Sequence, residues 1–379
     1  MDVNITKIIR VAQENRASDI HVVVGLPVRF RIDGLLKNYG QYIMTEADCE
    51  YIAHQLMGDS IKKFQDRGEY DCARTIDGDI RCRINVFKQQ GLYSVAIRLL
   101  SDSIPSFQML GLPPVVEAFP SWQRGIILVT GETGAGKSTT MAAMIERINQ
   151  TRPQHIITLE DPIEYVYTPA MCTINQREVG SDTESFETGL RAVLREDPDV
   201  IMLGEMRDLE TIETALIAAE TGHLVLATLH TKSAPETIDR IVNIFPAGKQ
   251  QQIRLQLSMS LNAVLSQQLI PRKNTEGRVL AYEVMINNPA IANLIREGKT
   301  PQIYNSMLTN QDAGNVTMDS TLVRLAQNGI IEREHAVNAA YDAEAVGLQL
   351  NIGTSFQQAQ PNAYANQNMQ KRNTFYDLT

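Results

Sequence analysis

The chain has 379 residues, 43% of them hydrophobic and 21% charged, which is enough for two domains with ordinary cores. Its net charge of −9 and pI of about 5.3 give no support for sequence-independent binding to DNA, and we expect no nucleic acid among its partners. No apolar run approaches the roughly 18 residues that span a bilayer, charged residues stand too early for a signal peptide, and the four cysteines form no C-x-x-C pair, so we expect a cytoplasmic protein without a zinc ribbon or a redox dithiol.

Residues 1–100 have the pattern of a small α+β domain. Apolar residues recur at helical spacing from Ile5, and an alternating apolar segment runs up to Asp33-Gly34, a dipeptide typical of a hairpin turn. Residues 46–64 suggest a second helix. These elements predict a sheet that is accompanied by helices.

Two further strands are expected at residues 80–87 and 92–100. Apolar residues occupy one face of each strand, and Arg83 and Arg98 lie on the opposite faces. A solvated sheet face is one explanation of these arginines. The other is a role at a site outside this domain.

A Pro-containing connection, residues 101–114, leads into a second region, 115–345, in which strands alternate with helices. This rhythm predicts a parallel sheet with helices on both faces. The strands that we expect are Ile126–Thr130, His155–Glu160, Val200–Leu203 and Leu224–Thr228. Residues 346–379 are rich in Gln and Asn and are expected to form a disordered tail.

A glycine-rich segment after the first of these strands fits a phosphate-binding loop. It matches G-x-x-x-x-G-K-[ST] between a buried strand and a segment of helical composition. Its glycines let backbone N–H groups point inward, Lys137 would neutralise phosphate charge, and the Ser138 hydroxyl would hold Mg²⁺. We therefore predict that nucleotide phosphates and Mg²⁺ bind here, through Gly131, Glu132, Thr133, Gly134, Ala135, Gly136, Lys137, Ser138 and Thr139. The loop alone does not name the nucleotide, because kinases, GTPases and motors all use it.

Polar clusters follow the other three strands, at the edge of a parallel sheet where ligands collect. Glu164 follows the second strand, Glu205 the third and His230 the fourth. ATP hydrolysis needs a carboxylate that orients or deprotonates the attacking water, and both glutamates are candidates. Because Gly204 ends the third strand where an Asp is usual, we expect Mg²⁺ on Ser138 and waters, with Glu205 acting on it through water.

Two histidines flank the fourth strand. At about 3.3 Å per residue, His223 and His230 would lie about 20 Å apart, so one nucleotide cannot engage both. His230, at the ligand end, is the candidate sensor of the γ-phosphate. His223 is either structural or in contact with a neighbouring subunit.

The boxes that carry these residues resemble those of the secretion and pilus ATPases. Segments 157–165, 204–208 and 219–231 resemble their Asp box, their atypical Walker B box and their His box, and the order of the boxes covers residues 1–345. Residues 290–297 are similar to a helix typical of the retraction ATPases of type IV pili, the PilT family, which is the branch that the chain resembles most.

The resemblance implies an ATP-hydrolysing hexameric motor that drives pilus retraction and twitching motility. It implies a PAS-like N-terminal domain followed by a RecA-like ATPase domain. It also implies a cytoplasmic location, peripheral at the inner membrane, where the motor docks on the pilus platform protein. By position, Glu164 takes the family's general-base role and Glu205 its Walker B role, and the arginines near the nucleotide or the subunit interface are Arg83, Arg98 and Arg240.

The helix over residues 290–297 is a candidate contact surface. Ile291, Leu294 and Ile295 have i, i+3, i+4 spacing and predict one apolar face, while Arg296 lies off that stripe. The helix either transmits motion to another subunit or to the platform through Arg296, or it is an amphipathic helix that only covers the core.

Other functions remain open at this point. Within the family, the alternatives are an accessory retraction ATPase of the PilU type and an ATPase of pilus assembly or type II secretion. Outside it, a nucleotide-gated scaffold is disfavoured by the intact Lys137, Glu164 and Glu205. A small-molecule P-loop kinase would not explain the arginines of a separate N-terminal domain.

Overall fold

The structure is a computed structural model that describes residues 4–32, 34–100 and 103–351. Its contacts define two compact units. The first consists of the described residues up to Leu269 together with Leu280–Met318, and the second of Ile270–Val279 together with the described residues from Asp319. The predicted boundaries at residues 100 and 114 remain predictions.

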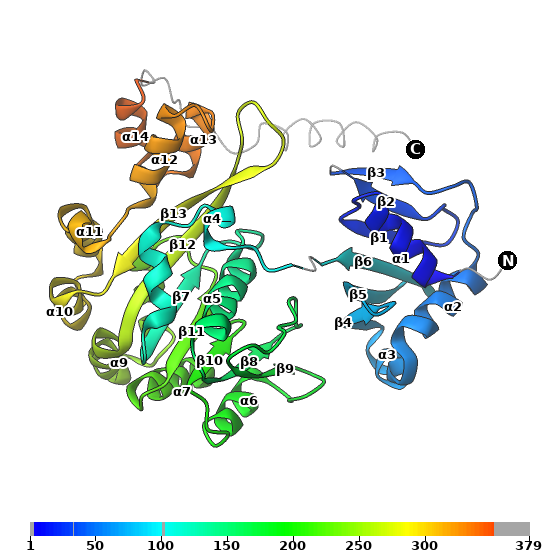
Figure 1. Cartoon of the computed structure of the whole chain (residues 1–379), viewed down its shortest axis with the longest axis horizontal. Coiled ribbons are helices and arrows are strands. Elements are labelled where there is room, and N and C mark those ends of the chain that lie inside the picture. The colour runs from blue at the N-terminus through cyan, green and yellow to red at the C-terminus, as the bar shows by residue number, and fades with distance from the viewer. Residues whose placement is uncertain (1–3, 33, 101–102, 352–379) are drawn as a thin grey trace, which may run out of the picture. The chain divides into compact units, whose positions relative to one another are not determined.

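The N-terminal part of the first unit is an antiparallel sheet of six strands (Figure 1). Their order in the sheet is β3-β2-β1-β6-β5-β4, so the first and last strands, β1 and β6, pair in the middle of the sheet, and β3 and β4 form its edges. The strands are β1 (Asp19–Val22), β2 (Arg29–Ile32), β3 (Leu35–Asn38), β4 (Glu69–Ile76), β5 (Ile80–Gln89) and β6 (Leu92–Leu99).

Three helices accompany this sheet: α1 (Ile5–Glu14), α2 (Glu46–Met57) and α3 (Ile61–Arg67). Apolar side chains of α1 and α2 share one core with alternate residues of the strands. The prediction of one helix over residues 46–64 is wrong, because Gly58 ends α2 with a φ of 54° and a 3₁₀ turn follows before α3 begins. Strands β1 and β4 were not predicted.

The rest of the first unit is built on a seven-stranded sheet with the order β13-β12-β7-β11-β10-β8-β9. All neighbours from β12 to β9 are parallel, which confirms the predicted parallel sheet. The four predicted strands are β7 (Gly125–Thr130), β8 (His155–Glu160), β10 (Val200–Leu203) and β11 (Leu224–Leu229). Three strands were missed: β9 (Thr173–Glu178), β12 (Leu261–Pro271) and β13 (Arg278–Ile286).

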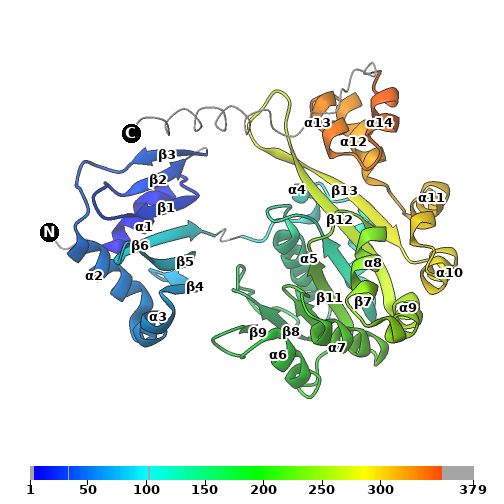
Figure 2. The same ribbon diagram turned by 180° about the vertical axis from the view of Figure 1, so that it is seen from behind.

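Helices pack on both faces of the parallel sheet (Figure 2). Ile126 and Leu128 of β7 lie in one core with α6 to α10, whereas Ile127 and Val129 lie in another core with α5. Alternate residues of a strand thus serve opposite layers. The helices are α4 (Phe107–Leu110), α5 (Lys137–Thr151), α6 (Phe186–Val193), α7 (Leu209–Glu220), α8 (Ala234–Asn243), α9 (Ala247–Ser260), α10 (Pro289–Glu297) and α11 (Ile303–Thr309).

The second unit contains the tip of the β12–β13 hairpin and the last helices, α12 (Met318–Gln327), α13 (Arg333–Ala339) and α14 (Ala343–Gln349). The Asp319 carboxylate accepts hydrogen bonds from the backbone N–H groups of Tyr341 and Asp342, at 2.7 and 3.0 Å. Helix α14 extends into the predicted tail, whose residues from 352 lie outside the described residues.

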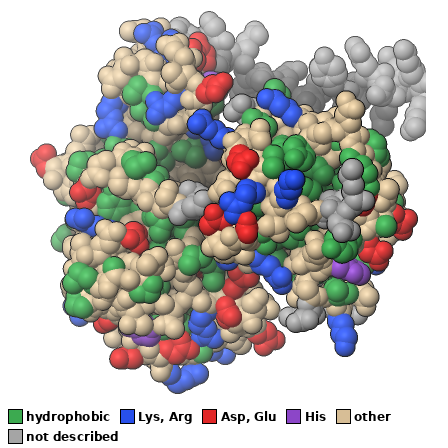
Figure 3. Space-filling view, turned by 45° about the vertical axis from the view of Figure 1, so that its right-hand side comes forward, with side chains coloured by type: hydrophobic (Ala, Val, Ile, Leu, Met, Phe, Trp, Pro, Cys, Tyr) green, Lys and Arg blue, Asp and Glu red, His purple; other side chains and the backbone are tan. Residues whose placement is uncertain are grey.

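Charged side chains lie mainly at the surface. On the face drawn in Figure 3, basic and acidic side chains stand close to one another among neutral and apolar ones. Exposed ion pairs of this kind contribute little to stability. By contrast, Glu160, Glu178 and Glu283 are buried. In the described part of the chain, no helix is long and apolar enough to cross a membrane.

Candidate nucleotide-binding and active site

The glycine-rich loop lies between β7 and α5, as predicted. Gly131 leaves the strand with a φ of 143°, and a Cβ at this position would lie 2.4 Å from the backbone oxygen of Gln267 on β12. Only glycine permits this close approach of the two backbones. Gly136, with a φ of 91°, precedes the first residue of α5, so the N-terminal N–H groups of that helix face the loop.

The ammonium group of Lys137 is buried inside this loop. Its Nζ donates to the backbone oxygens of Gly131 and Glu132, at 2.7 and 3.1 Å, and lies 3.4 Å from Nδ1 of His230. Burial lowers the pKa of Lys137, while the charges of Glu205 and Glu164 oppose this effect. No carboxylate among the described residues forms an ion pair with Lys137, so a phosphate would supply the missing anion.

His230 connects Lys137 to Glu205, the residue that is expected to take the Walker B role. Nε2 of His230 lies 3.0 Å from Oε1 of Glu205, and Arg207 holds the other carboxylate oxygen at 2.7 Å. Because an ammonium group can only donate, Nδ1 of His230 accepts from Lys137 and Nε2 carries the proton that faces Glu205. Burial by itself would raise the pKa of Glu205, but the hydrogen bonds from Arg207 and His230 bring it below its usual value.

The loop after β8 contains a second carboxylate with opposite surroundings. Glu160 is 7% exposed and accepts hydrogen bonds from Thr158 and from Gln176 on β9, at 2.7 and 3.0 Å. Burial raises the pKa of Glu160 to about 7, against the lowering effect of these two donors. Glu164, four residues further on, is partly exposed, and its backbone N–H donates to the Glu160 carboxylate.

Tyr165 connects this loop to α5, the helix that follows the phosphate loop. Its hydroxyl lies 3.0 Å from Oγ1 of Thr139, and its backbone oxygen accepts from Gln176 at 2.8 Å. Our sequence reasoning did not assign a role to Tyr165 or Gln176. Tyr165 ends the segment 157–165 that resembles a family box, and Gln176 lies on β9, a strand that was not predicted. Nothing in their spacing indicates which atoms they contact.

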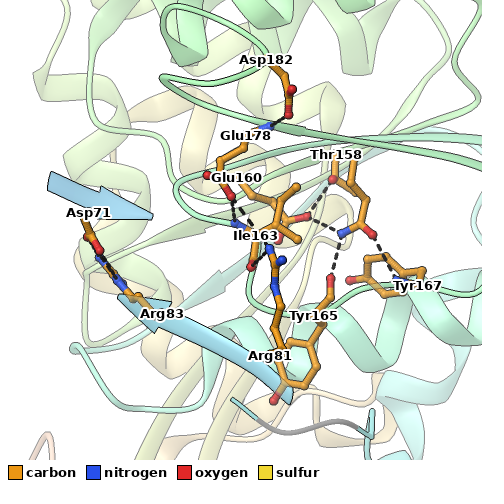
Figure 4. A network of polar contacts seen from close by, with 11 residues as sticks. Asp71, Arg81, Arg83, Thr158, Glu160, Ile163, Tyr165, Tyr167, Glu178 and Asp182 are labelled. Atoms are coloured by element: carbon orange, nitrogen blue, oxygen red, sulfur yellow. Dashed lines mark hydrogen bonds and ion pairs between the residues drawn. The ribbon is translucent and has the colours of Figure 1, made fainter. Parts of the chain in front are cut away.

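Arg83 and Arg98 are cross-strand neighbours on β5 and β6. Each is paired with a carboxylate of its own sheet: Nη2 of Arg83 lies 2.7 Å from Asp71 (Figure 4), and Nε of Arg98 lies 2.9 Å from Asp19. The hydrogen bond with Asp71 is the main reason why the pKa of Arg83 is raised, and the charge of Glu164 contributes. The predicted role of both arginines at the nucleotide therefore stays a prediction.

The remaining predicted residues lie away from this network. His223 stands at the start of β11, where its Nδ1 lies 2.9 Å from the backbone oxygen of Ala218. Arg240 is exposed on α8 and Arg296 on α10. The predicted apolar face of α10 is confirmed, because Ile291 and Ile295 are fully buried.

The residues present fit a nucleotide with Mg²⁺. Ser138 is exposed at the N-terminus of α5, where its hydroxyl can reach a metal ion beside the phosphates. No group of three or more His, Cys, Asp or Glu side chains among the described residues could hold a metal by itself. Mg²⁺ in phosphate sites characteristically takes few protein ligands and completes its shell with phosphate oxygens and waters.

Comparisons with known proteins identify relatives along most of the chain. The family described as "Type II/IV secretion system protein" matches residues 2–338. The chain is 44% identical to "Type IV pilus retractation ATPase PilT" of Pseudomonas aeruginosa, over 88% of this chain and 97% of that protein. It is 35% identical to "Type IV pilus ATPase PilU" of the same organism, over 92% and 91%. The solved structure of "the Pilus Retraction Motor PilT and Bound ADP" superposes with a TM-score of 0.85 and 49% identity, over 90% and 98%.

Proposed function

The chain belongs to the family of type II/IV secretion system proteins, and we propose that it is an ATP-hydrolysing motor that retracts type IV pili and so drives twitching motility. The observation that carries this proposal is its 44% identity to a retraction ATPase over 97% of that protein. The contacts among Lys137, His230 and Glu205 support it, because the groups proposed for ATP hydrolysis lie close together at one edge of the sheet.

The proposed chemistry divides among four residues. Bound ATP with Mg²⁺ supplies the phosphoryl group that is transferred to water. Lys137 neutralises phosphate charge, and the Ser138 hydroxyl would hold the metal ion. Glu164 orients or deprotonates the water, while Glu205, kept ionised by the hydrogen bonds from Arg207 and His230, would act on the metal ion through water.

His230 is proposed to sense the γ-phosphate. Its Nδ1 contacts the ammonium of Lys137, and its Nε2 contacts Glu205. A phosphate that draws Lys137 away from the loop carbonyls would therefore change the surroundings of both His230 and Glu205. Arg83 and Arg98 are proposed to complete the site once they exchange Asp71 and Asp19 for phosphate oxygens.

We further propose that six copies of the chain form a ring that works in the cytoplasm beneath the pilus platform protein of the inner membrane. His223, Arg240 and Arg296 are proposed contacts of this assembly, and the exposure of Arg240 and Arg296 leaves both free to meet another surface. Mass measurement of the native particle, with and without ATP, tests the hexamer.

Removal of the gene tests the proposed direction of force. We expect a strain that lacks the protein to keep its pili, to accumulate them at the surface and to lose twitching. The wild-type gene should restore retraction, and a Lys137→Ala copy should not. A strain without surface pili would instead identify the protein as an assembly ATPase. A separate assay of the purified protein tests the other alternative: absence of Mg²⁺-dependent ATPase activity would favour a nucleotide-gated scaffold.

An accessory retraction ATPase is the second candidate, because the identity to PilU extends over 92% of the chain. Expression in a strain that lacks every retraction ATPase separates the two. If this chain alone restores retraction, it is the principal motor. If it does so only together with a second retraction ATPase, it is the accessory one.

A further inference from the structure

The backbone of Ile163, the residue that precedes the proposed general base, is held by side chains on both sides (Figure 4). The backbone N–H of Ile163 donates to Oε2 of Glu178 at 3.1 Å, and its backbone oxygen accepts from Nη2 of Arg81 at 2.9 Å. Nη2 of Arg81 and Oε2 of Glu178 lie 4.0 Å apart. One ion pair thus brackets a single loop residue, and Glu164 is the next residue along the chain.

Both members of this pair come from regular strands, whereas Ile163 belongs to a loop. Arg81 lies on β5, between β4 and β6 in the antiparallel sheet, and Glu178 is the last residue of β9, opposite Glu160 of β8. The backbone N–H of Glu178 donates to Asp182 at 2.8 Å, which anchors that strand end. Strand residues position a neighbouring group more rigidly than loop residues do.

Burial distinguishes this pair from the ion pairs of the surface. The side chains of Arg81 and Glu178 are 16% and 12% exposed. Nε of Arg81 is buried without a hydrogen-bond partner among the described residues, so the guanidinium is oriented by its Nη2 contacts alone. A buried pair of this kind costs desolvation and is a weak source of stability, which leaves positioning as its main consequence.

We propose that Arg81 and Glu178 are positioning residues: they hold the carboxylate of Glu164 where it can orient or deprotonate the attacking water. This inference rests on the proposed function, in which Glu164 is the base. The Ile163 oxygen that accepts from Arg81 and the Glu164 N–H belong to one peptide plane, and that N–H donates to Glu160. Rotation of this plane would displace the Glu164 side chain, and a displacement of about 1 Å can cost about a hundredfold in rate.

Arg81→Gln tests the proposal, because loss of a positioning residue should lower kcat and leave KM for ATP nearly unchanged. The full-length variant should lose about 10- to 100-fold in kcat, while KM for ATP and the Kd of a non-hydrolysable analogue stay within about threefold of wild type. Glu178→Gln, which keeps an acceptor for the Ile163 N–H but loses the charge, should show a smaller loss of the same kind. Arg81→Lys should recover part of the rate.

Arg74→Gln is the matched control. Arg74 also lies on the antiparallel sheet and donates from Nη2 to a backbone oxygen, that of Met57, at 3.3 Å in a partly buried setting. Its loss removes the same kind of hydrogen bond without touching the loop of Glu164. We expect its kcat to equal that of wild type, and thermal unfolding of all variants shows whether they are folded.

The double variant Arg81→Gln/Glu164→Gln decides how Arg81 acts. If Arg81 works through the base, its substitution should lower kcat no further once Glu164 is gone, because neighbours that act as a unit are not additive. An additive loss, a raised KM with unchanged kcat, or a normal kcat in folded Arg81→Gln would each overturn the proposal. Wild-type protein without ATPase activity would instead overturn the proposed function.

Discussion

Two carboxylates follow neighbouring strands of the parallel sheet, Glu160 at the end of β8 and Glu205 just beyond β10, yet they have opposite surroundings. Arg207 and His230 hold Glu205, so its pKa is lowered and it is ionised at neutral pH. Glu160 meets only neutral donors in a buried place, and its pKa rises to about 7. One sheet edge therefore keeps one carboxylate as a permanent charge and lets the other change its charge near neutral pH.

The comparison teaches that residue type and strand position do not assign a role. Both residues are glutamates at the ligand edge of the same sheet, and both lie inside segments that resemble family boxes. Each has one partner two residues away in the chain, Arg207 or Thr158, and one from another element, His230 after β11 or Gln176 on β9. Four experiments test this contrast.

The largest loss of ATPase activity is expected when Lys137, the cation that contacts Glu205 through His230, is removed. Lys137→Ala should abolish ATPase activity, because phosphate charge then has no buried cation and His230 loses its donor. Phosphate release with Mg²⁺ and ATP measures it. Turnover close to wild type would remove the phosphate-loop assignment.

The next effect separates the base from the charge that acts on the metal. Glu164→Gln should keep ATP binding and slow hydrolysis by about 10²–10⁴, the usual worth of a positioned acid or base. Single-turnover kinetics together with analogue binding gives both quantities. If Glu205→Gln were the only inactive variant and Glu164→Gln were active, the two roles would have to be exchanged.

The third effect concerns stability and pH on the Glu160 side. A carboxyl group with a raised folded-state pKa stabilises the fold at low pH, and this stability is lost as pH rises from about 4.5 to about 7. Glu160→Gln keeps an oxygen that can accept from Thr158 and Gln176 and does not titrate. At about 1.4 kcal/mol per pKa unit, the variant should gain about 3 kcal/mol over wild type between pH 5 and pH 8.

Thermal unfolding of the full chain at these two pH values measures this difference. The variant should unfold several degrees higher than wild type at pH 8, and the gap should shrink at pH 5. A gap that does not depend on pH would show that Glu160 does not change its charge in this range.

The smallest effect concerns an exposed pair at the phosphate loop. Lys232 lies 2.9 Å from Glu132, an acidic residue inside the loop. Lys232→Ala should weaken ATP binding about two- to fivefold at low salt, because Glu132 then faces the phosphates without its partner. The double variant Lys232→Ala/Glu132→Gln should bind ATP as wild type does.

Lys249→Ala removes a similar exposed pair, with Glu213 at 3.1 Å, and serves as the control. It should leave ATP binding unchanged, because neither residue touches the phosphate loop. Equal losses in Lys232→Ala and Lys249→Ala would show that the effect is general to surface charge. Titration calorimetry at two salt concentrations gives the affinities.

Much of the fold was predictable because its signals are local. The four predicted strands are buried on both faces and appear as short apolar runs, as parallel strands do. Strand β9 was missed because its segment Thr173–Glu178 carries mostly polar side chains at the edge of the sheet. The helix expected over residues 46–64 breaks at Gly58, which has a positive φ that only glycine adopts at low cost.

Local sequence was enough to predict the phosphate loop, the polar residues Glu164, Glu205 and His230 after the strands, and the two arginines of the other sheet, because each prediction depends on spacing within one segment. The contacts among these residues could not be predicted in this way. Lys137 meets His230 from 93 residues away, and Arg81 meets Ile163 from 82 residues away. Such contacts depend on which strands become neighbours, and the order β12-β7-β11-β10-β8-β9 follows from how complete layers pack on each face, which no single segment encodes.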